Sequence, residues 1–513
     1  MNDQQQDDWS IVEFRDGREV FTSREQLLER SARLATALSR RGLSAGDSLC
    51  YLLANSIAVF EIIKAAKILG AYPVPINYHF KSDESRYILC DSRAKALVTS
   101  AEFVQSADEA GHGLEALDGR RLCIGNNPSD GGREGFDDYE TTVADSPPWQ
   151  GDPRPAPAVV IYTSGTTGNP KGVVREAGSP EAATSMLTIF RDTCKMGDRP
   201  VHLVTGPLYH SAPSTFAAGV LALGGKLILL PKYDSERTLQ AIQKYRVTNL
   251  HLVPTMMHRM LALPEQVRSR YDLSSVVAVQ HAAAPCPRET KEAMIEWWGP
   301  VIDEYYGSTE CGMATYITSA EALAHPGSVG RAIDGVTVAI LKADGDPCPV
   351  GEVGDVYVGN LASENFQYHG DPDKRERSMK EGLFTNGDMG YLDEDGYLFL
   401  VDRRADMIIS GGVNIYPAEI EAVLHGHKEV ADCAVFGIPD KEWGEAVHAV
   451  IELAAGAHLD AGQIQTYCAK HLSGYKVPRS VEFADELPRQ PSGKIYKRKL
   501  REKYWQGRNS SIV

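Results

Sequence analysis

One short stretch of the chain concentrates groups that can bind phosphate. Residues Tyr162–Val173 read YTSGTTGNPKGV, where three glycines and four Ser or Thr hydroxyls surround one lysine, directly after the apolar run AVVI. A strand that enters such a turn can present backbone N–H groups and hydroxyls to phosphate oxygens, while the lysine supplies charge. An ordinary surface loop is the alternative for any Gly/Ser/Thr cluster. A P-loop kinase or ATPase is disfavoured because Lys171 follows a proline and precedes a glycine, which breaks the GxxxxGK[ST] pattern.

Four more motifs with polar or charged residues follow along the chain. They are YYGSTE at 305–310, NGDMGYLDEDGY at 386–397, VDRRADMIISGGVNIYPAEIE at 401–421 and LPRQPSGKIYKRKLR at 487–501. Taken alone, Glu310 or Asp388 would more often be a surface or turn carboxylate, and Lys494 a solvated charge among other basic residues. In this order, the five motifs resemble those of the adenylate-forming superfamily, which contains acyl-CoA synthetases, adenylation domains of peptide synthetases and beetle luciferase.

The resemblance implies that the protein joins a carboxylic acid to AMP and transfers the acyl group to CoA. ATP, CoA and Mg²⁺ are the cofactors that it implies. Attack on the α-phosphate concentrates negative charge, so cations and hydrogen-bond donors are expected around that phosphate. The implied catalytic residues are Lys494, which would bridge the carboxylate and the α-phosphate, Thr309, Glu310 and, beside the acyl site, His210.

Further residues would bind the nucleotide, the metal or CoA. Asp388 would accept the ribose hydroxyls, Arg403 would steady ribose and phosphate, and Tyr306 would pack against adenine. Asp406 would be the hinge about which a C-terminal domain rotates. Glu310 and Thr166 would hold Mg²⁺. The implied cofactor-binding set is Thr163, Ser164, Gly165, Thr166, Thr167, Gly168, Lys171, Ala283, Ala284, Pro285, Tyr305, Tyr306, Gly307, Asp388, Arg403 and, at the pantetheine channel, Gly411 and Gly412. Trp443–Glu445 and Lys476 resemble positions near CoA.

The acid is expected to be hydrophobic. No Asp or Glu lies between Gly206 and Pro231, where relatives that activate amino acids place a carboxylate. The small apolar residues of this segment favour a wide pocket for an aliphatic, aromatic or polycyclic acid. The chain is similar to bacterial fatty-acid CoA ligases and to ligases for bile-acid or steroid side chains.

Some alternatives stay open, and some positions depart from the family pattern. The acceptor could be a separate carrier protein instead of CoA, or the adenylate could feed a luciferase-like oxygenase. A purely structural or binding role is a further, less favoured alternative. Asn386 replaces the usual Thr or Ser, alanines occupy 282–284 where a glycine is commoner, and the chain reads REAGSPE after Val174.

Composition restricts the partners and the compartment. Of the 513 residues, 43% are hydrophobic and 24% charged, and the net charge is −16, which argues against nucleic acid as a partner. The nine cysteines form no CxxC pair, so a disulfide framework or a zinc cluster is disfavoured and a cytoplasmic protein is expected. No integral membrane segment is expected, since the most apolar helical stretch, 57–69, carries Glu61, Lys64 and Lys67. A homodimer is possible.

The elements that must position these residues follow an alternating pattern. Strand and helix patterns alternate over the first half, which predicts a largely parallel α/β sheet. Helices are predicted at Ile57–Leu69, Ser235–Tyr245 and Arg288–Trp298, and an exposed connection at Gly125–Pro157. The expected fold is α/β: a large N-terminal domain (1–402) of α/β sheets with helices plus a β-rich subregion from about Gly327, followed by a small mobile α+β C-terminal domain (403–513).

Overall fold

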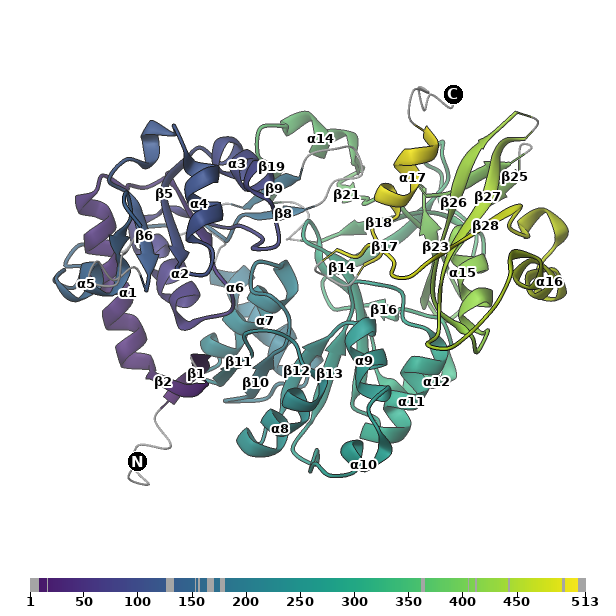
Figure 1. Ribbon diagram of the computed structural model, residues 1–513, viewed down its shortest axis with the longest axis horizontal. Coiled ribbons are helices and arrows are strands. Elements are labelled where there is room, and N and C mark those ends of the chain that lie inside the picture. Colours follow the sequence, from purple (N-terminus) through teal and green to yellow (C-terminus); the bar gives the residue numbers. More distant parts are fainter. Residues whose placement is uncertain are drawn as a thin grey trace.

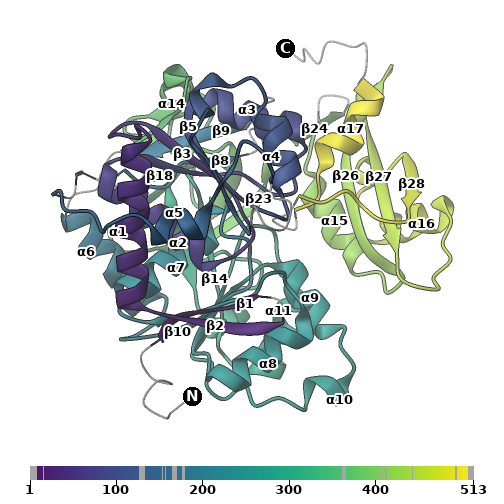
Figure 2. The same ribbon diagram turned by 60° about the vertical axis from the view of Figure 1, so that its left-hand side comes forward.

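The computed structural model describes residues 9–15, 17–125, 133–152, 154–155, 157–163, 170–175, 180–360, 365–404, 406–410, 413–441, 443–490 and 494–505. The described chain forms a large N-terminal domain and a smaller C-terminal domain that lies against one side of it (Figures 1 and 2). Within these described ranges, no helix combines the length and the apolar character that a bilayer crossing needs.

The first sheet of the N-terminal domain is parallel and has the strand order β4-β3-β5-β6-β7. Alternate residues of its strand β3 face opposite helix layers: Leu49 and Tyr51 face α1 and α2, while Cys50 and Leu52 face α3 and α4. The strands are β3 (Ser48–Leu52), β4 (Tyr72–Pro75), β5 (Ala94–Ser100), β6 (Arg121–Ile124) and β7 (Asp137–Asp138), and the helices are α1 (Arg24–Arg40), α2 (Ile57–Leu69), α3 (Ser82–Asp91) and α4 (Val104–Gly111).

The second sheet has nine strands in the order β16-β15-β14-β13-β12-β10-β11-β1-β2, with a parallel centre and antiparallel edges. One face shares α1, α2 and α7 with the first sheet, and the other face is covered by α8, α9 and α11. The strands are β1 (Trp9–Arg15), β2 (Arg18–Ser23), β10 (Val201–Val204), β11 (Lys226–Leu229), β12 (Asn249–Leu252), β13 (Ala278–His281), β14 (Ile302–Ser308), β15 (Gly312–Ile317) and β16 (Arg331–Ala332). The helices are α6 (Pro180–Thr188), α7 (Ser211–Ala222), α8 (Ser235–Tyr245), α9 (Pro254–Leu261), α10 (Glu265–Arg268), α11 (Arg288–Trp298) and α12 (Ser319–Ala324).

Two smaller antiparallel sheets complete the N-terminal domain. The sheet β19-β9-β8 is the hairpin of the glycine-rich motif with one added strand, and β17, β18 and β20–β23 form the expected β-rich subregion. Their bounds are β8 (Ile161–Thr163), β9 (Lys171–Arg175), β19 (Phe366–Tyr368), β17 (Thr337–Leu341), β18 (Gly354–Gly359), β20 (Met379–Lys380), β21 (Leu383–Phe384), β22 (Asp388–Leu392) and β23 (Leu398–Arg403), with the short helix α14 (Pro372–Arg377).

The C-terminal domain is built on a long antiparallel pair, β26 and β27, which buries Val435, Val447 and Ile451 against two helices. Its helix α17 carries the basic end of the last motif and packs on β26. The elements are β24 (Ile408–Ser410), β25 (Val413–Ile415), α15 (Pro417–His425), β26 (Val430–Asp440), β27 (Gly444–Leu453), α16 (Ala461–His471), β28 (Ser480–Ala484) and α17 (Lys497–Trp505).

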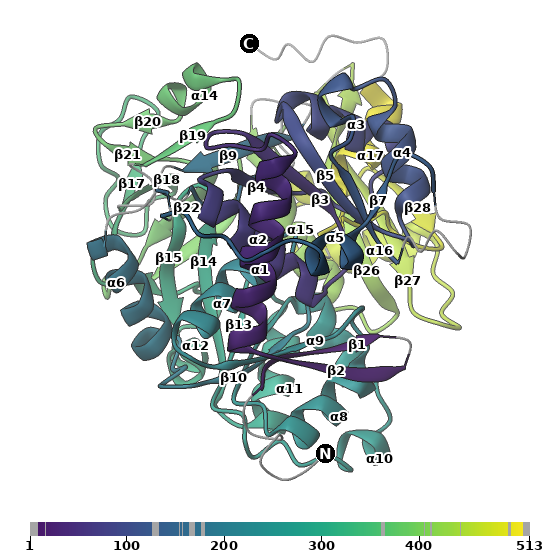
Figure 3. The same ribbon diagram turned by 90° about the vertical axis from the view of Figure 1, so that its left-hand side faces the viewer.

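The α/β expectation is confirmed, and one detail of it is wrong. The segment 125–157 is not merely an exposed connection, because it contains the helix α5 (Tyr139–Ala144). Tyr139 is fully buried, and its hydroxyl donates to Glu61 Oε2 of α2 at 2.7 Å. Figure 3 shows α5 beside α1 and α2. Tyr139 and Val143 are both buried and anchor this helix. The Gly, Pro and Asp residues around the helix made the segment look like a loop.

Candidate active site

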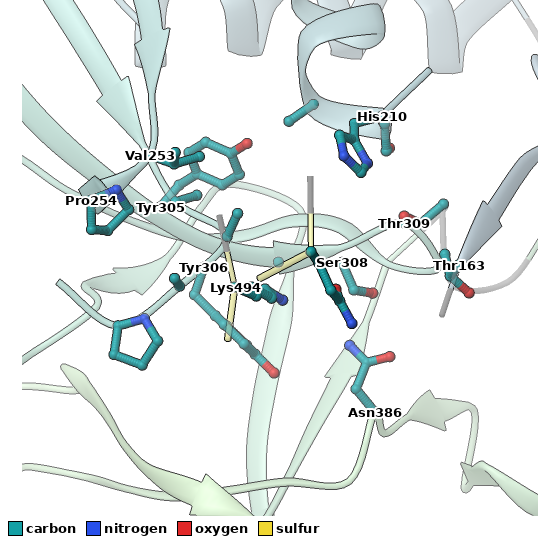
Figure 4. A pocket seen from close by; sticks show the side chains of 18 of the residues that line it. Thr163, His210, Val253, Pro254, Tyr305, Tyr306, Ser308, Thr309, Asn386 and Lys494 are labelled. Atoms are coloured by element: carbon teal, nitrogen blue, oxygen red, sulfur yellow. The ribbon is translucent and has the colours of Figure 1, made fainter. Parts of the chain in front are cut away.

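The residues of the five motifs meet at one cavity between the two domains. Its volume is about 3280 Å³. The carboxyl ends of β12, β13 and β14 open onto it, as is usual for ligand sites of parallel sheets, and α7, β22 and β23 line it from other sides. Lys494 reaches it from the C-terminal domain (Figure 4).

A carboxylate with two fixed partners forms one wall of the cavity. Asp388 lies at the start of β22, directly after Gly387, whose φ of +79° makes the turn. Tyr306 Oη donates to Asp388 Oδ2 at 2.7 Å, and Arg403 Nε donates to Asp388 Oδ1 at 3.1 Å. Burial and the neighbouring Asp388 charge raise the pKa of Tyr306 far above its ordinary value. A carboxylate has about four acceptor sites, so Asp388 can still accept hydrogen bonds from ligand hydroxyls.

Thr309 and Glu310 are held by the turn that ends β14. Ser308 Oγ accepts the backbone N–H of Glu310 at 3.2 Å. Arg175 donates to the carbonyl oxygens of Thr309 and Glu310 at 2.7 and 2.6 Å. The side chain of Glu310 is 7% exposed and accepts the Tyr368 hydroxyl at 3.0 Å. The backbone of this turn is therefore held from β9 as well as from within.

Sequence reasoning missed Arg175 as a site residue. Its position was noticed only as a departure from the family pattern, and no local signal indicates contact with residues 134 positions away. The pairing of β9 with β19 and the proximity of β14 create the contact, and only the tertiary structure contains it.

Two lysines form a cationic patch next to Glu310. Lys171 Nζ lies 4.0 Å from Asp371, and Lys374 stacks over the Tyr368 ring at 4.2 Å. Burial lowers the pKa of Lys374, while the nearby Glu310 and Asp371 charges oppose that shift and Lys171 adds to it. Sequence reasoning also missed Lys374. Such a patch suits a phosphate chain, to which both lysines could donate in addition to their contacts with Asp371 and Glu310.

Lys494 lies near Arg403, Asp388 and Glu310. Burial lowers its pKa to about 8, and the Arg403 charge adds to this, while the two carboxylates oppose it. His210, at the start of α7, faces the same space (Figure 4). Burial and then the Lys494 charge lower the pKa of His210 to about 4, so this imidazole is neutral at physiological pH.

The adenine-loop candidates line the cavity between β13 and α11, with a strained backbone. Ala283 has φ of +76°, a left-handed conformation that a residue with a Cβ adopts at a cost. Ala284 and Pro285 continue the loop along the cavity. Gly307 has no room for a side chain, because a Cβ there would lie 2.0 Å from the carbonyl oxygen of Gly312.

Tyr305, expected among the nucleotide-binding residues, lies on the other side of its strand from Tyr306, since successive strand residues point to opposite faces. Its hydroxyl is 3.0 Å from His251 Nε2, and its ring centroid is 5.9 Å from that of Phe216 on α7. Phe216 in turn contacts Phe190 at 5.3 Å between centroids. These rings and the small residues of α7 form an apolar compartment of the cavity.

Asp406, the predicted hinge, also lines the cavity, and its backbone N–H donates to the Arg403 carbonyl at 3.0 Å. Other predicted site residues lie elsewhere or outside the described ranges. Glu445 and Lys476 lie in the C-terminal domain. Glu445 accepts the Ile409 N–H, and Lys476 donates to Glu419. The candidates outside the described residues are Ser164, Gly165, Thr166, Thr167, Gly168, Gly411 and Gly412.

Comparison with known proteins agrees with this geometry. The AMP-binding enzyme family matches residues 2–362, and its C-terminal domain, the AMP-binding enzyme C-terminal domain, matches 419–494. A feruloyl-CoA synthase from Amycolatopsis sp is 34% identical over 93% of each chain. The fatty acid–[acyl-carrier-protein] ligase ScoC from Streptomyces coeruleorubidus is 32% identical over 94% of this chain and 91% of its own. The structure of ATP-bound MatB from Rhodopseudomonas palustris has a TM-score of 0.84 at 28% identity, covering 98% of this chain and 97% of that one.

The chain therefore belongs to the AMP-binding enzyme family, in the CoA-ligase branch of the adenylate-forming superfamily. Its class is that of AMP-forming acid–thiol ligases, with ATP, a carboxylic acid and CoA as substrates. The predicted superfamily and the predicted fold are both confirmed.

Proposed function

We propose that this ligase activates a hydrophobic carboxylic acid, which is fatty, aromatic or polycyclic, and transfers it to CoA. The observation that carries the proposal is the convergence of Lys494, Asp388, Arg403 and Glu310 at one buried point between the domains. Two cations and two carboxylates this close suit a ligand with both hydroxyls and phosphate charge.

In the first half-reaction, an oxygen of the acid attacks the α-phosphate of ATP, and pyrophosphate leaves. Asp388 accepts the ribose hydroxyls, and Tyr306 and Arg403 hold it in place for this. Lys494 contacts both the attacking carboxylate and the α-phosphate, and Thr309 donates to the same phosphate. Hydrogen-bond donors and cations that already point to the position of the developing negative charge contribute most to the rate of such a step.

The leaving pyrophosphate lies beside Lys171 and Lys374, with the neighbouring residues of the glycine-rich motif (Thr163–Lys171). The Glu310 carboxylate has the oxygen chemistry that Mg²⁺ prefers, and it lies at the edge of this cationic patch. Glu310 would hold the ion together with Thr166, and the ion would neutralise phosphate charge there.

In the second half-reaction, the thiol of CoA attacks the acyl carbonyl and AMP leaves. We place the domain boundary at 402/403 and the hinge at Asp406, so rotation of the C-terminal domain would withdraw Lys494 and open a path for the thiol, which Gly411 and Gly412 would line. His210 is neutral and lies beside the acyl group. A neutral imidazole there does not compete with Lys494 for the carboxylate.

The apolar compartment supports the choice of acid. It is lined by Phe190, Phe216 and Tyr305 and by the small residues of α7, and α7 itself contains no charged side chain. A flat ring or an alkyl chain buries more apolar surface there than a charged group can. Tyr305 would then contact the acid instead of the nucleotide. The feruloyl and fatty-acid names of the two relatives point to the same range of acids.

A panel of acids tests the proposal. Purified protein receives ATP, Mg²⁺ and acids that range from acetate through decanoate and ferulate to a bile acid, and pyrophosphate and thioester are measured with and without CoA. We expect pyrophosphate release that needs both acid and ATP, and thioester only after CoA is added, with the hydrophobic acids preferred. Preference for acetate or for an amino acid would contradict the proposed class of acid.

The ScoC relative makes a carrier protein the specific alternative acceptor. Replacing CoA by a phosphopantetheinylated carrier protein in the same assay separates the two. Faster transfer to the carrier than to CoA at equal concentrations would favour that alternative.

A further inference from the structure

Lys494 is carried by a hairpin of the C-terminal domain, in which residues 488–490 pair with residues 494–496. Residues Arg489 and Ile495 form an antiparallel bridge. The Gln490 N–H donates to the Lys494 carbonyl at 2.7 Å, and the Tyr496 N–H donates to the Pro488 carbonyl at 2.6 Å. The backbone of Lys494 is therefore held to the strand that contains Arg489, and movement of one strand moves the other.

That hairpin is attached to the domain core at its first strand. Leu487 is 1% exposed among Phe436 and Val450, and its N–H donates to Glu452 Oε2 at 2.9 Å. Two residues later, the Arg489 guanidinium donates to Asp432 Oδ2 on β26. This second contact ties the hairpin strand that faces Lys494 to β26 through a charged pair.

Asp432 is itself held from another element. Its Oδ1 accepts the Cys433 N–H at 2.7 Å and lies 2.8 Å from Nε2 of His425, the last residue of α15. Burial alone would raise the pKa of Asp432, but His425 and Arg489 lower it to about 2. Burial alone would lower the pKa of His425, but Asp432 and then Glu421 raise this pKa above its ordinary value. The arrangement is a half-buried chain of charges, His425–Asp432–Arg489.

We infer that Asp432, supported by His425, is a positioning residue: it holds Arg489 and thereby the hairpin that places Lys494 in the active site. The inference rests on the proposed role of Lys494. It assigns a function in adenylation to a residue of β26 that lines the same large cavity but would act through Arg489 and not on the reacting atoms. A displacement of about 1 Å at a reacting group can cost roughly 10²-fold in rate.

A metal centre is the other use for these atoms, and the geometry disfavours it. Atoms of His425, Asp432 and Cys433 lie within 4.8 Å of one another. However, Arg489 holds the second oxygen of Asp432, and a metal would bring its charge against that guanidinium. Burial, followed by the nearby Glu421 and Asp432 charges, raises the pKa of the Cys433 thiol well above its ordinary value, which disfavours the thiolate that a metal ligand requires.

The test compares the two half-reactions in Asp432→Asn. Asparagine retains an acceptor for the Cys433 N–H but loses the charge that holds Arg489 and His425. With the acid that wild-type protein activates best, we expect kcat of ATP–pyrophosphate exchange to fall by about 10- to 100-fold, with KM for ATP and for acid changed less than about threefold. Thioester formation from the synthetic acyl-adenylate and CoA should stay at the wild-type rate, since Lys494 acts only in the first step.

Two further variants complete the design. Glu482→Gln is the matched control, because it neutralises another carboxylate of the same domain. Glu482 lies in the middle of β28 and is paired with Lys503 at 2.6 Å, and its replacement should leave both half-reactions unchanged. Arg489→Lys keeps the positive charge but loses the planar set of donors of the guanidinium. The rate of ATP–pyrophosphate exchange should fall to a value between those of wild type and Asp432→Asn, with thioester formation unchanged. If Asp432→Asn does not fold, Arg489→Lys carries the test by itself.

Some outcomes overturn the inference. Wild-type exchange in both Asp432→Asn and Arg489→Lys, or an equal loss in both half-reactions, would mean that the chain does not position Lys494. Stoichiometric zinc in the purified wild-type protein, lost in Asp432→Asn, would replace the inference by a metal centre. Absence of exchange in the wild-type protein with every acid is a different result, which contradicts the proposed function itself.

Discussion

The lowered pKa of Lys494 predicts that ATP binding takes up a proton. Burial moves the pKa of this ammonium from 10.5 to about 8, which corresponds to about 3 kcal/mol against the charged form. The charged fraction of a lysine falls as pH rises through its pKa. In the unliganded protein, the uncharged fraction of Lys494 is therefore about one tenth at pH 7, one half at pH 8 and nine tenths at pH 9. The negative phosphates of ATP would restore the charge, and each restored charge takes a proton from the buffer.

Calorimetry measures this uptake directly. ATP and Mg²⁺ are titrated into the protein without acid, so that no reaction follows, in two buffers with different ionisation enthalpies at each pH. The Lys494→Met variant keeps the length of the side chain and removes its charge. We expect the wild-type protein to take up about 0.1, 0.5 and 0.9 more protons than the variant at pH 7, 8 and 9. His210 does not contribute in this range, because its pKa is about 4.

The same shift predicts the pH dependence of catalysis. The profile of kcat/KM for ATP reports groups of the free enzyme, and it should fall above about pH 8. The variant should also lose about 10²- to 10³-fold in adenylate formation, the cost of one preorganised donor. Equal proton uptake by both proteins at pH 8 and 9 would refute the reasoning, because it would mean that Lys494 is either charged in the free protein or remote from the phosphates.

Three further predictions concern the walls of the site. Ala283→Gly should raise the melting temperature or leave it unchanged, because it relieves a left-handed alanine that costs about 1–2 kcal/mol. The control Ala284→Gly should lower the free energy of unfolding, measured in urea, by about 0.5–1 kcal/mol. Gly219→Ala places a Cβ 2.5 Å from the Phe190 ring, so this ring must move and the preference among acids of different length should change by at least about threefold in kcat/KM; an unchanged preference would place the acid elsewhere. Arg175→Met removes the donors to two site carbonyls and should lower kcat of pyrophosphate exchange by about tenfold or more, while a loss confined to KM for the acid would contradict this.

Local signals in the sequence predicted much of the scaffold. Ser23 and Gln26 have the spacing of a capping box, a local signal for a helix start, and both reciprocal hydrogen bonds are present at the start of α1. The helices α2, α8 and α11 have the predicted bounds. These elements carry their own start and stop residues and a helical apolar pattern, so neighbours in the chain are sufficient to define them. By contrast, α5 depends on Tyr139 reaching Glu61, a contact that no local pattern contains.

By itself, the sequence determined the family, the order of the motifs and the residue types that can bind a nucleotide and an acid, because these depend on chemical identity and spacing along the chain. Only the tertiary structure decided how they meet. It brought Lys494 to Asp388 and Glu310, turned Tyr305 and Tyr306 to opposite sides of β14, set Arg175 under the Thr309–Glu310 turn, and put Ala283 in a left-handed conformation. The physical reason is that burial, desolvation and long-range hydrogen bonds arise from the packing of distant segments, which local sequence patterns do not encode.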